Sequence, residues 1–184
     1  LSDLIKIQSK VIVKIDQRLI NLFSKTFKEI KFIPADQNLQ SNLYEKYISI
    51  GSLPKHLRKS FYHFENSSFE GLRSNELKNK KIEKQFKFLK NLKIGFSWHS
   101  YGKKTGNLRS LKQRDVISLL NTGHSFINLQ YGDIFDEIKA INFSSENQLI
   151  TIDGIDLKFD IDDVASIIYN CDLIITIDNT VAHL

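Results

Sequence analysis

The chain has 184 residues, of which 41% are hydrophobic and 26% are charged, with a net charge of +5, a composition typical of a soluble globular protein. No apolar run approaches the length that spans a membrane, and residues 1–20 carry charges throughout, which argues against a signal peptide. With one cysteine, Cys171, an intrachain disulfide and a cysteine-based metal cluster are excluded, so we expect a reducing, cytoplasmic setting.

The first 73 residues predict alternating helices and strands. Residues 11–15 and 29–33 are short β-branched runs typical of strands, and residues 18–27 have the apolar spacing of a helix with Asp16 as its N-cap. This order makes up half of a doubly wound sheet. A further strand is expected at residues 44–50.

Two segments near the middle of the chain are rich in basic side chains. Residues 56–71 interleave aromatic and basic residues, which is compatible with a nucleic-acid surface, although rings that pack on a domain edge are the interpretation we favour. Residues 75–92 predict a long amphipathic helix, with Ser74 as its N-cap, that connects two domains. Its expected buried stripe consists of Leu77, Ile82, Phe86 and Leu89.

From residue 93 strands and helices alternate regularly, which predicts a parallel sheet. The expected strands are residues 93–98, 125–130, 149–152 and 173–177, and the expected helices are residues 113–121, 135–141 and 162–170. The domain organisation that follows is a partial domain at 1–73, a connecting helix at 74–92 and a second partial domain at 93–184. Because the chain has no methionine and stops one turn into a predicted helix, we expect a fragment truncated at both ends.

Polar side chains gather in three loops that follow predicted strands of the second half. In a parallel sheet such loops share one edge, where ligands bind. Residues 178–180 also precede a predicted helix, whose N-terminus favours an anion. An ordinary strand-to-helix corner with a capping Asn or Thr is the alternative. The loops at 97–110, 130–133 and 178–180 offer hydroxyls (Ser97, Ser100, Thr180), cations (Lys103, Lys104, Arg109), an amide (Gln130), an aromatic ring (Tyr131) and carboxylates (Asp133, with Glu137 beyond).

Common cofactor motifs are missing from the sequence. It contains neither the glycine-rich dinucleotide fingerprint nor a phosphate-binding P-loop, and its five histidines lack metal-ligand spacing. Asp160 and Asp162 resemble a metal-binding pair only superficially, since they open a helix, where Asp is favoured by the helix dipole. We therefore expect no metal and no cofactor.

Six short motifs, in this order along the chain, resemble those of a known enzyme family. They are DQRL at 16–19, GSLP at 51–54, GFSWHS at 95–100, RSL at 109–111, FINLQYGD at 126–133 and DLIITIDNTVAHL at 172–184. The series is similar to that of bacterial glycosyltransferases often fused to tetratricopeptide repeats and related to the heptosyltransferases. The resemblance implies an α/β fold with two Rossmann-like domains of the GT-B type, both incomplete here.

The family also implies an activity. It transfers a sugar from a nucleotide-diphosphate sugar to a saccharide, lipid-linked or protein acceptor, with inversion and without a metal or nucleic-acid partner. A non-catalytic nucleotide- or sugar-binding module of the same fold is the alternative, and this fragment alone is expected to be inactive. A basic nucleic-acid-binding domain is a third, weaker hypothesis.

The resemblance carries over to individual positions. His99 departs from the family, many of whose members have Arg there, and no general base can be named because the acceptor-side base is expected upstream of Leu1. By position, the donor diphosphate would contact Ser97, Arg109, Asp178, Asn179, Thr180 and His183, and the base and ribose would contact Gln130, Tyr131, Gly132 and Glu137.

Overall fold

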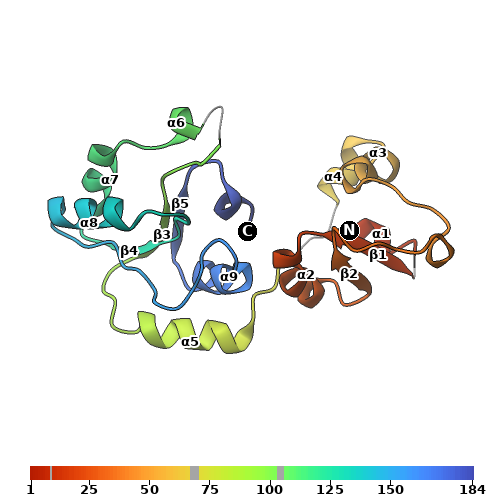
Figure 1. Ribbon diagram of the computed structural model, residues 1–184, viewed down its shortest axis with the longest axis horizontal. Helices are drawn as coiled ribbons and strands as arrows, with labels where there is room; N and C mark the ends of the chain where they lie inside the picture. Colours follow the sequence, from red (N-terminus) through yellow and green to blue (C-terminus); the bar gives the residue numbers. More distant parts are fainter. Residues whose placement is uncertain (9, 67–70, 103–105) are drawn as a thin grey trace. The chain divides into compact units, whose positions relative to one another are not determined.

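The protein is a mixed α/β chain with two small parallel sheets (Figure 1). The structure is a computed structural model that describes residues 1–8, 10–66, 71–102 and 106–184. The chain divides into two compact units, Leu1–Arg73 and Ser74–Leu184, each with its own sheet. None of the described helices combines the length and the hydropathy that a membrane span needs.

The first unit is built on two parallel strands. Strand β1 (Val11–Ile15) pairs with β2 (Ile30–Pro34), and helix α2 (Ile20–Thr26) connects them. The rings of Phe23 and Phe32 meet edge to face at 5.8 Å between centroids, a favoured geometry for aromatic pairs. A cluster of buried and half-buried apolar side chains therefore forms between the helix and the two strands.

Asp16 caps a short 3₁₀ turn, η1 (Gln17–Leu19), directly before α2. Its carboxylate accepts hydrogen bonds from the backbone N–H and the guanidinium of Arg18. These bonds favour the charged form and lower the pKa of Asp16 to about 2. The cap expected at this residue is thus present, one turn earlier than the α-helix itself.

The strand expected at residues 44–50 is absent. This segment is irregular between η2 (Ser41–Leu43) and η3 (Ile50–Ser52), and the ring of Tyr47 is 89% exposed. A strand needs a neighbour for its backbone groups, and no described segment pairs with these residues. The other helices of this unit are α1 (Ser2–Ile5), α3 (Leu53–Leu57) and α4 (Phe61–Glu65).

The second unit has a three-stranded parallel sheet with an added bridge. Strand β3 (Lys93–Ser97) lies in the centre, between β4 (Ser125–Asn128) and β5 (Leu173–Thr176). On the far side of β4, Ile150 forms an isolated parallel bridge to Ile127, where a full strand at 149–152 was expected. When β3, β4, the Ile150 bridge and β5 are numbered 1 to 4 along the chain, their order across the sheet is 3-2-1-4. The first three are added in one direction, and β5 is added on the opposite side of β3.

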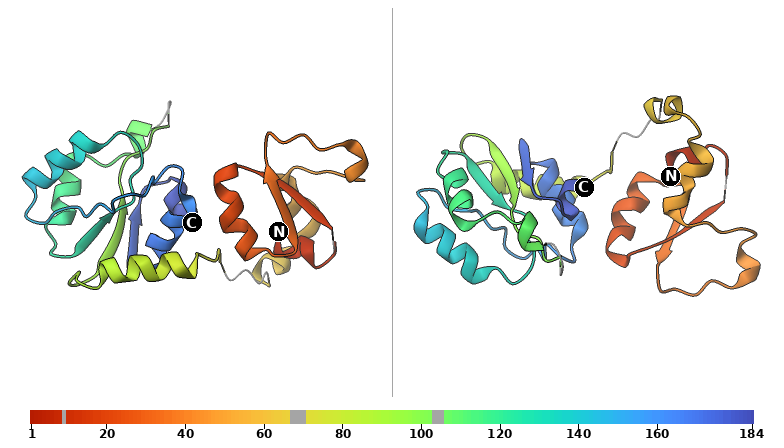
Figure 2. Two further views of the ribbon diagram at one scale, coloured as in Figure 1. Left: turned by 60° about the horizontal axis from the view of Figure 1, so that its bottom comes forward. Right: turned by 90° about the horizontal axis from the view of Figure 1, so that it is seen from above.

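Helices cover both faces of this sheet, as Figure 2 shows. Helices α7 (Gln113–Leu120) and α8 (Phe135–Ser144) pack on one face, and α5 (Glu76–Phe86) and α9 (Ile161–Tyr169) pack on the other. Successive strand residues point to opposite faces, so the alternation sorts them between the two cores. Ile94, Phe96, Trp98, Phe126 and Ile175 face α7 and α8, while Ile127, Leu129 and Ile174 face α5 and α9.

Helix α5 is shorter than expected and is an integral part of the second unit. Asn75, not Ser74, is its N-cap, since the Asn75 side chain accepts hydrogen bonds from the backbone N–H groups of the first turn. Ile82 and Phe86 are buried as expected, but Leu77 is 79% exposed. Leu77 lies outside the stripe because α5 turns only the side of Ile82 and Phe86 toward α9.

An ionic contact joins α5 to the first turn of α9. The ammonium of Lys78 lies between the carboxylates of Asp162, at 3.3 Å, and Asp163, to which it donates a hydrogen bond. Burial alone would lower the pKa of Lys78, but the two carboxylates outweigh it and raise the pKa. The Asp residues at this helix start therefore serve α5–α9 packing.

The two-faced core makes a testable distinction between two phenylalanines. Phe126 is 1% exposed in the core under α7 and α8, whereas Phe143 on α8 is 92% exposed. We expect Phe126→Ala to lower the free energy of unfolding by about 3–5 kcal/mol, because it leaves a cavity. Phe143→Ala should change it by less than about 0.5 kcal/mol.

The measurement is urea unfolding followed by fluorescence. Trp98 is the single tryptophan and is fully buried in the same core, so its emission reports the second unit alone. Equal effects of the two substitutions would contradict the orientation of α8 described above.

Candidate functional site at the sheet rim

The carboxyl ends of β3, β4 and β5 lie on the same edge of the second sheet, because all three strands are parallel. We call the described residues of the segments that leave this edge, 97–102, 106–111, 129–133 and 177–184, the sheet rim. The order in which the chain adds strands to the sheet reverses between β3 and β5. In open α/β sheets a ligand crevice forms at such a point, outside the carboxyl ends of the strands.

Gln130, at the end of β4, holds the start of the first rim segment. Its side-chain oxygen accepts three hydrogen bonds, from Ser97 Oγ at 2.9 Å, Trp98 N at 3.1 Å and His99 N at 2.8 Å. Its own backbone N–H donates to Asn128 Oδ1 at 2.8 Å. Gln130 is 1% exposed and positions the first rim segment, while its expected contact with a base or ribose stays a prediction.

Ser97 extends this network to the third rim segment, across the switch point, the place between β3 and β5 where the strand order reverses. Its hydroxyl donates to Gln130 and accepts from Asn179 Nδ2 at 2.7 Å. Asn179 Oδ1 accepts from Val181 N at 2.9 Å and lies 3.1 Å from Thr176 Oγ1. One of the N–H groups expected to be free for an anion is therefore capped by Asn179. The expected α-helix start is a 3₁₀ turn, η4 (Thr180–His183).

The first rim segment folds back on itself. Leu111 N donates to Trp98 O at 2.9 Å, and Ser100 N donates to Ser110 Oγ at 3.0 Å, which donates in turn to Gly106 O. A Cβ on Gly106 would lie 2.2 Å from the carbonyl oxygen of Ser100, so only glycine fits there. This closure places the short helix α6 (Gly106–Arg109) over the sheet edge.

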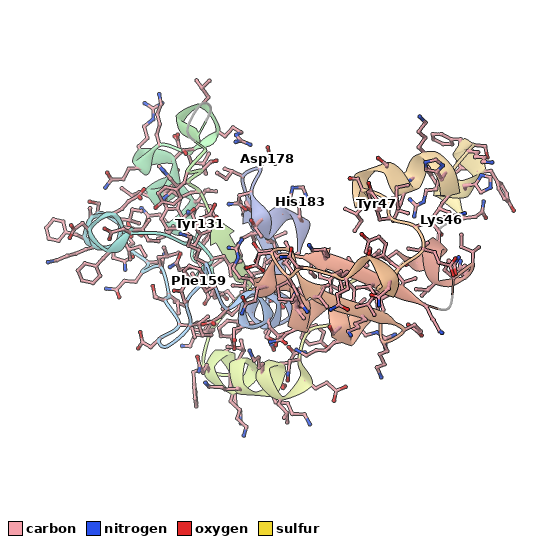
Figure 3. The ribbon with its side chains drawn as sticks, turned by 45° about the vertical axis from the view of Figure 1, so that its right-hand side comes forward. Lys46, Tyr47, Tyr131, Phe159, Asp178 and His183 are labelled. Carbon is pink, nitrogen blue, oxygen red and sulfur yellow. The ribbon has the colours of Figure 1, made fainter. Side chains whose placement is uncertain are left out.

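Arg109 at the end of α6 reaches the third rim segment. Its guanidinium forms an ion pair of 2.5 Å with the Asp178 carboxylate, and it packs closely on Gly102. Figure 3 labels Asp178 and His183, which come from the segment after β5. His183 Nε2 lies 3.9 Å from Asp178 and its side chain is largely exposed, as is Thr180 at the start of η4. Arg109, Asp178, Thr180 and His183 thus lie on one rim.

The second rim segment carries aromatic and acidic groups. Tyr131, labelled in Figure 3, approaches Tyr101 with 5.7 Å between ring centroids. Gly132 follows with φ of 107°, a conformation that favours glycine. Glu137 accepts a hydrogen bond from the buried indole N–H of Trp98 at 2.8 Å, so one of its oxygens has a structural role.

Several contributors to the rim escaped the sequence analysis. Asn128, Tyr101 and Ser110 each make a rim contact that the sequence does not signal. Such contacts depend on how the loops fold and on which side chains turn inward. Lys103 and Lys104, expected as cations, lie outside the described residues. Within the described ranges, no group of three or more His, Cys, Asp or Glu side chains could hold a metal ion.

The rim combines one guanidinium with hydroxyl and backbone donors on a rigid hydrogen-bonded base. Arginine binds phosphate through two parallel N–H···O bonds, which makes it well suited to a phosphate ester. An exposed ion pair contributes at most about 1 kcal/mol, so an anionic ligand can replace Asp178 as the partner of Arg109 at small cost.

Comparison with known proteins gives one partial similarity. Protein FlbA of Caulobacter vibrioides is 34% identical over 94 residues, which is 50% of this chain and 16% of FlbA. No protein-family model and no solved structure matches the chain. These results correct the expected membership of the repeat-linked, GT-B glycosyltransferase family: the similarity leads to FlbA and not to a glycosyltransferase, and no family or fold match supports the assignment.

The Gln130 network yields a stability prediction. Gln130→Leu leaves three donors without an acceptor in or near the core, and we expect it to lower the free energy of unfolding by about 2–4 kcal/mol. The same change at exposed Gln148 should have an effect below about 0.5 kcal/mol. Urea unfolding monitored through Trp98 measures both, and equal stabilities would show that the network is dispensable.

Proposed function

We propose that the sheet rim binds the diphosphate of a nucleotide-diphosphate sugar, and that the protein transfers the sugar to a saccharide, lipid-linked or protein acceptor. The observation that carries the proposal is the placement of Arg109 across the switch point, where it pairs with Asp178. A cation at this position, next to the Ser97–Asn179 link, is suited to hold the negative end of a nucleotide.

The proposal includes a fold. Each unit would be part of a Rossmann-like domain, and the 3-2-1-4 order of the second unit supports this. In the first unit the support is the parallel β1–α2–β2 arrangement. The single cysteine is compatible with a reducing compartment such as the cytoplasm, where we place the reaction.

The proposed reaction is a single displacement with inversion. An acceptor oxygen forms a bond to the anomeric carbon as the bond from that carbon to the diphosphate oxygen breaks, and the acceptor proton passes to a base on the acceptor side. The leaving diphosphate gains negative charge, which Arg109 and preorganised hydrogen-bond donors would stabilise without a metal. Asp178 would hold the guanidinium in place until the ligand arrives.

A binding module without turnover is the second candidate. It draws support from Gln130 and Glu137, because the Gln130 side-chain oxygen and one Glu137 oxygen are engaged in structural hydrogen bonds. Release of free nucleoside diphosphate, measured with each of several nucleotide sugars and with a mixed glycan and peptide acceptor pool, separates the two. Binding without any release would favour the module.

The test of the binding step compares two arginines. We expect Arg109→Ala to weaken the binding of a nucleoside diphosphate by at least about 10-fold, since a charge-assisted pair with phosphate is lost. Arg114→Ala on α7 is the matched control, because Arg114 is exposed and pairs with its neighbour Asp115, and it should leave affinity unchanged. Isothermal titration calorimetry on the full chain measures both, and equal losses, or no binding by the unmodified protein, would contradict the proposal.

A further inference from the structure

Three aromatic rings from two rim segments contact one another, and the residue after the central ring lies against Arg109. His99 and Tyr101 lie 4.7 Å apart between ring centroids, and Tyr101 and Tyr131 lie 5.7 Å apart. We call His99, Tyr101 and Tyr131 the aromatic shelf. Tyr101 is 45% exposed although it is the central ring, so part of its surface is open to a ligand.

The Tyr101 ring lies against Gly132 of the second rim segment. A Cβ on Gly132 would lie 2.5 Å from Tyr101 Oη and 2.6 Å from its ring carbons, so the ring rests directly on the backbone of the second rim segment. Gly102, the residue directly after Tyr101, packs on the guanidinium of Arg109. The shelf and the cation are therefore neighbours within one rim.

The charges around the shelf differ from those around Arg109. Burial and the nearby carboxylates of Glu137 and Asp133 raise the pKa of the Tyr101 hydroxyl. Negative charge at the shelf repels phosphate, whereas the guanidinium attracts it. A ligand that carries a diphosphate would therefore place the diphosphate at Arg109 and its remaining part on the rings. The carboxylates of Glu137 and Asp133 could then accept hydrogen bonds from N–H groups of that part.

We propose that Tyr101, in contact with both His99 and Tyr131, stacks on the nucleobase of the ligand through its exposed surface, so that the rim selects a nucleoside diphosphate over a diphosphate with any other substituent. Aromatic rings bind bases through their faces, and such stacking tolerates different bases. This inference rests on the proposed function, because it requires the diphosphate to lie at Arg109.

The experiment titrates the full chain with UDP, ADP, GDP and CDP, and separately with inorganic pyrophosphate. We expect Tyr101→Ala to weaken the binding of the preferred nucleoside diphosphate by about 10- to 100-fold and to leave pyrophosphate affinity unchanged. Tyr101→Phe keeps the ring and should bind like the unmodified protein. Tyr169→Ala is the matched control, since Tyr169 is an exposed ring on α9.

Gly132→Ala supplies a second variant in case Tyr101→Ala disturbs the loop. A Cβ there displaces the Tyr101 ring, so nucleoside diphosphate affinity should fall while pyrophosphate affinity stays. Nucleotide binding that depends on Arg109 but is insensitive to both variants would overturn the stacking role alone, as would an equal loss for pyrophosphate. Binding of pyrophosphate without any nucleotide also overturns it, and binding of neither ligand refutes the proposed function as well.

Discussion

A single buried amide holds the candidate site together. The side-chain oxygen of Gln130 accepts hydrogen bonds from one hydroxyl and two backbone N–H groups of the first rim segment. Ser97 passes this network on to Asn179, which in turn caps η4. Three segments that are far apart in the sequence therefore share one set of neutral, mostly buried hydrogen bonds, and their relative positions depend on it.

The charged contacts of the rim behave differently from this neutral network. Arg109 and Asp178 are exposed, so water and salt screen their attraction, and either group can exchange its partner. Ser97 and Gln130 are buried, where an unpaired polar atom is costly and the partners stay fixed. A rigid base beneath an exchangeable ion pair is the arrangement that an anion-binding site requires, because the ligand then replaces one contact without disturbing the others.

Most of the strands could be predicted from the sequence, whereas the hydrogen bonds of the rim could not. β-branched runs located β1 and β5. Helices cover both faces of the second sheet, which fits the nearly continuous apolar pattern of β5. The 3-2-1-4 order could not be derived in this way, because pairing between distant strands depends on how the helices pack. The structural hydrogen bonds of Gln130 and Glu137 could not be foreseen either, because composition does not reveal which polar side chain turns inward to satisfy a hydroxyl, an amide or an indole.

Glycine explains why a motif search fails at this rim. Neither Gly106 nor Gly132 belongs to a recognised phosphate-binding pattern. A Cβ on Gly106 would collide with Ser100 of its own segment, and a Cβ on Gly132 would collide with Tyr101 of another segment. Gly106 lets α6 close against Ser100, which carries Arg109 to Asp178, and Gly132 lets the Tyr101 ring lie on the second segment. The placement of Arg109 and of the aromatic shelf thus depends on a glycine in each of two separate loops. Because this placement arises from tertiary packing, no short sequence motif encodes it.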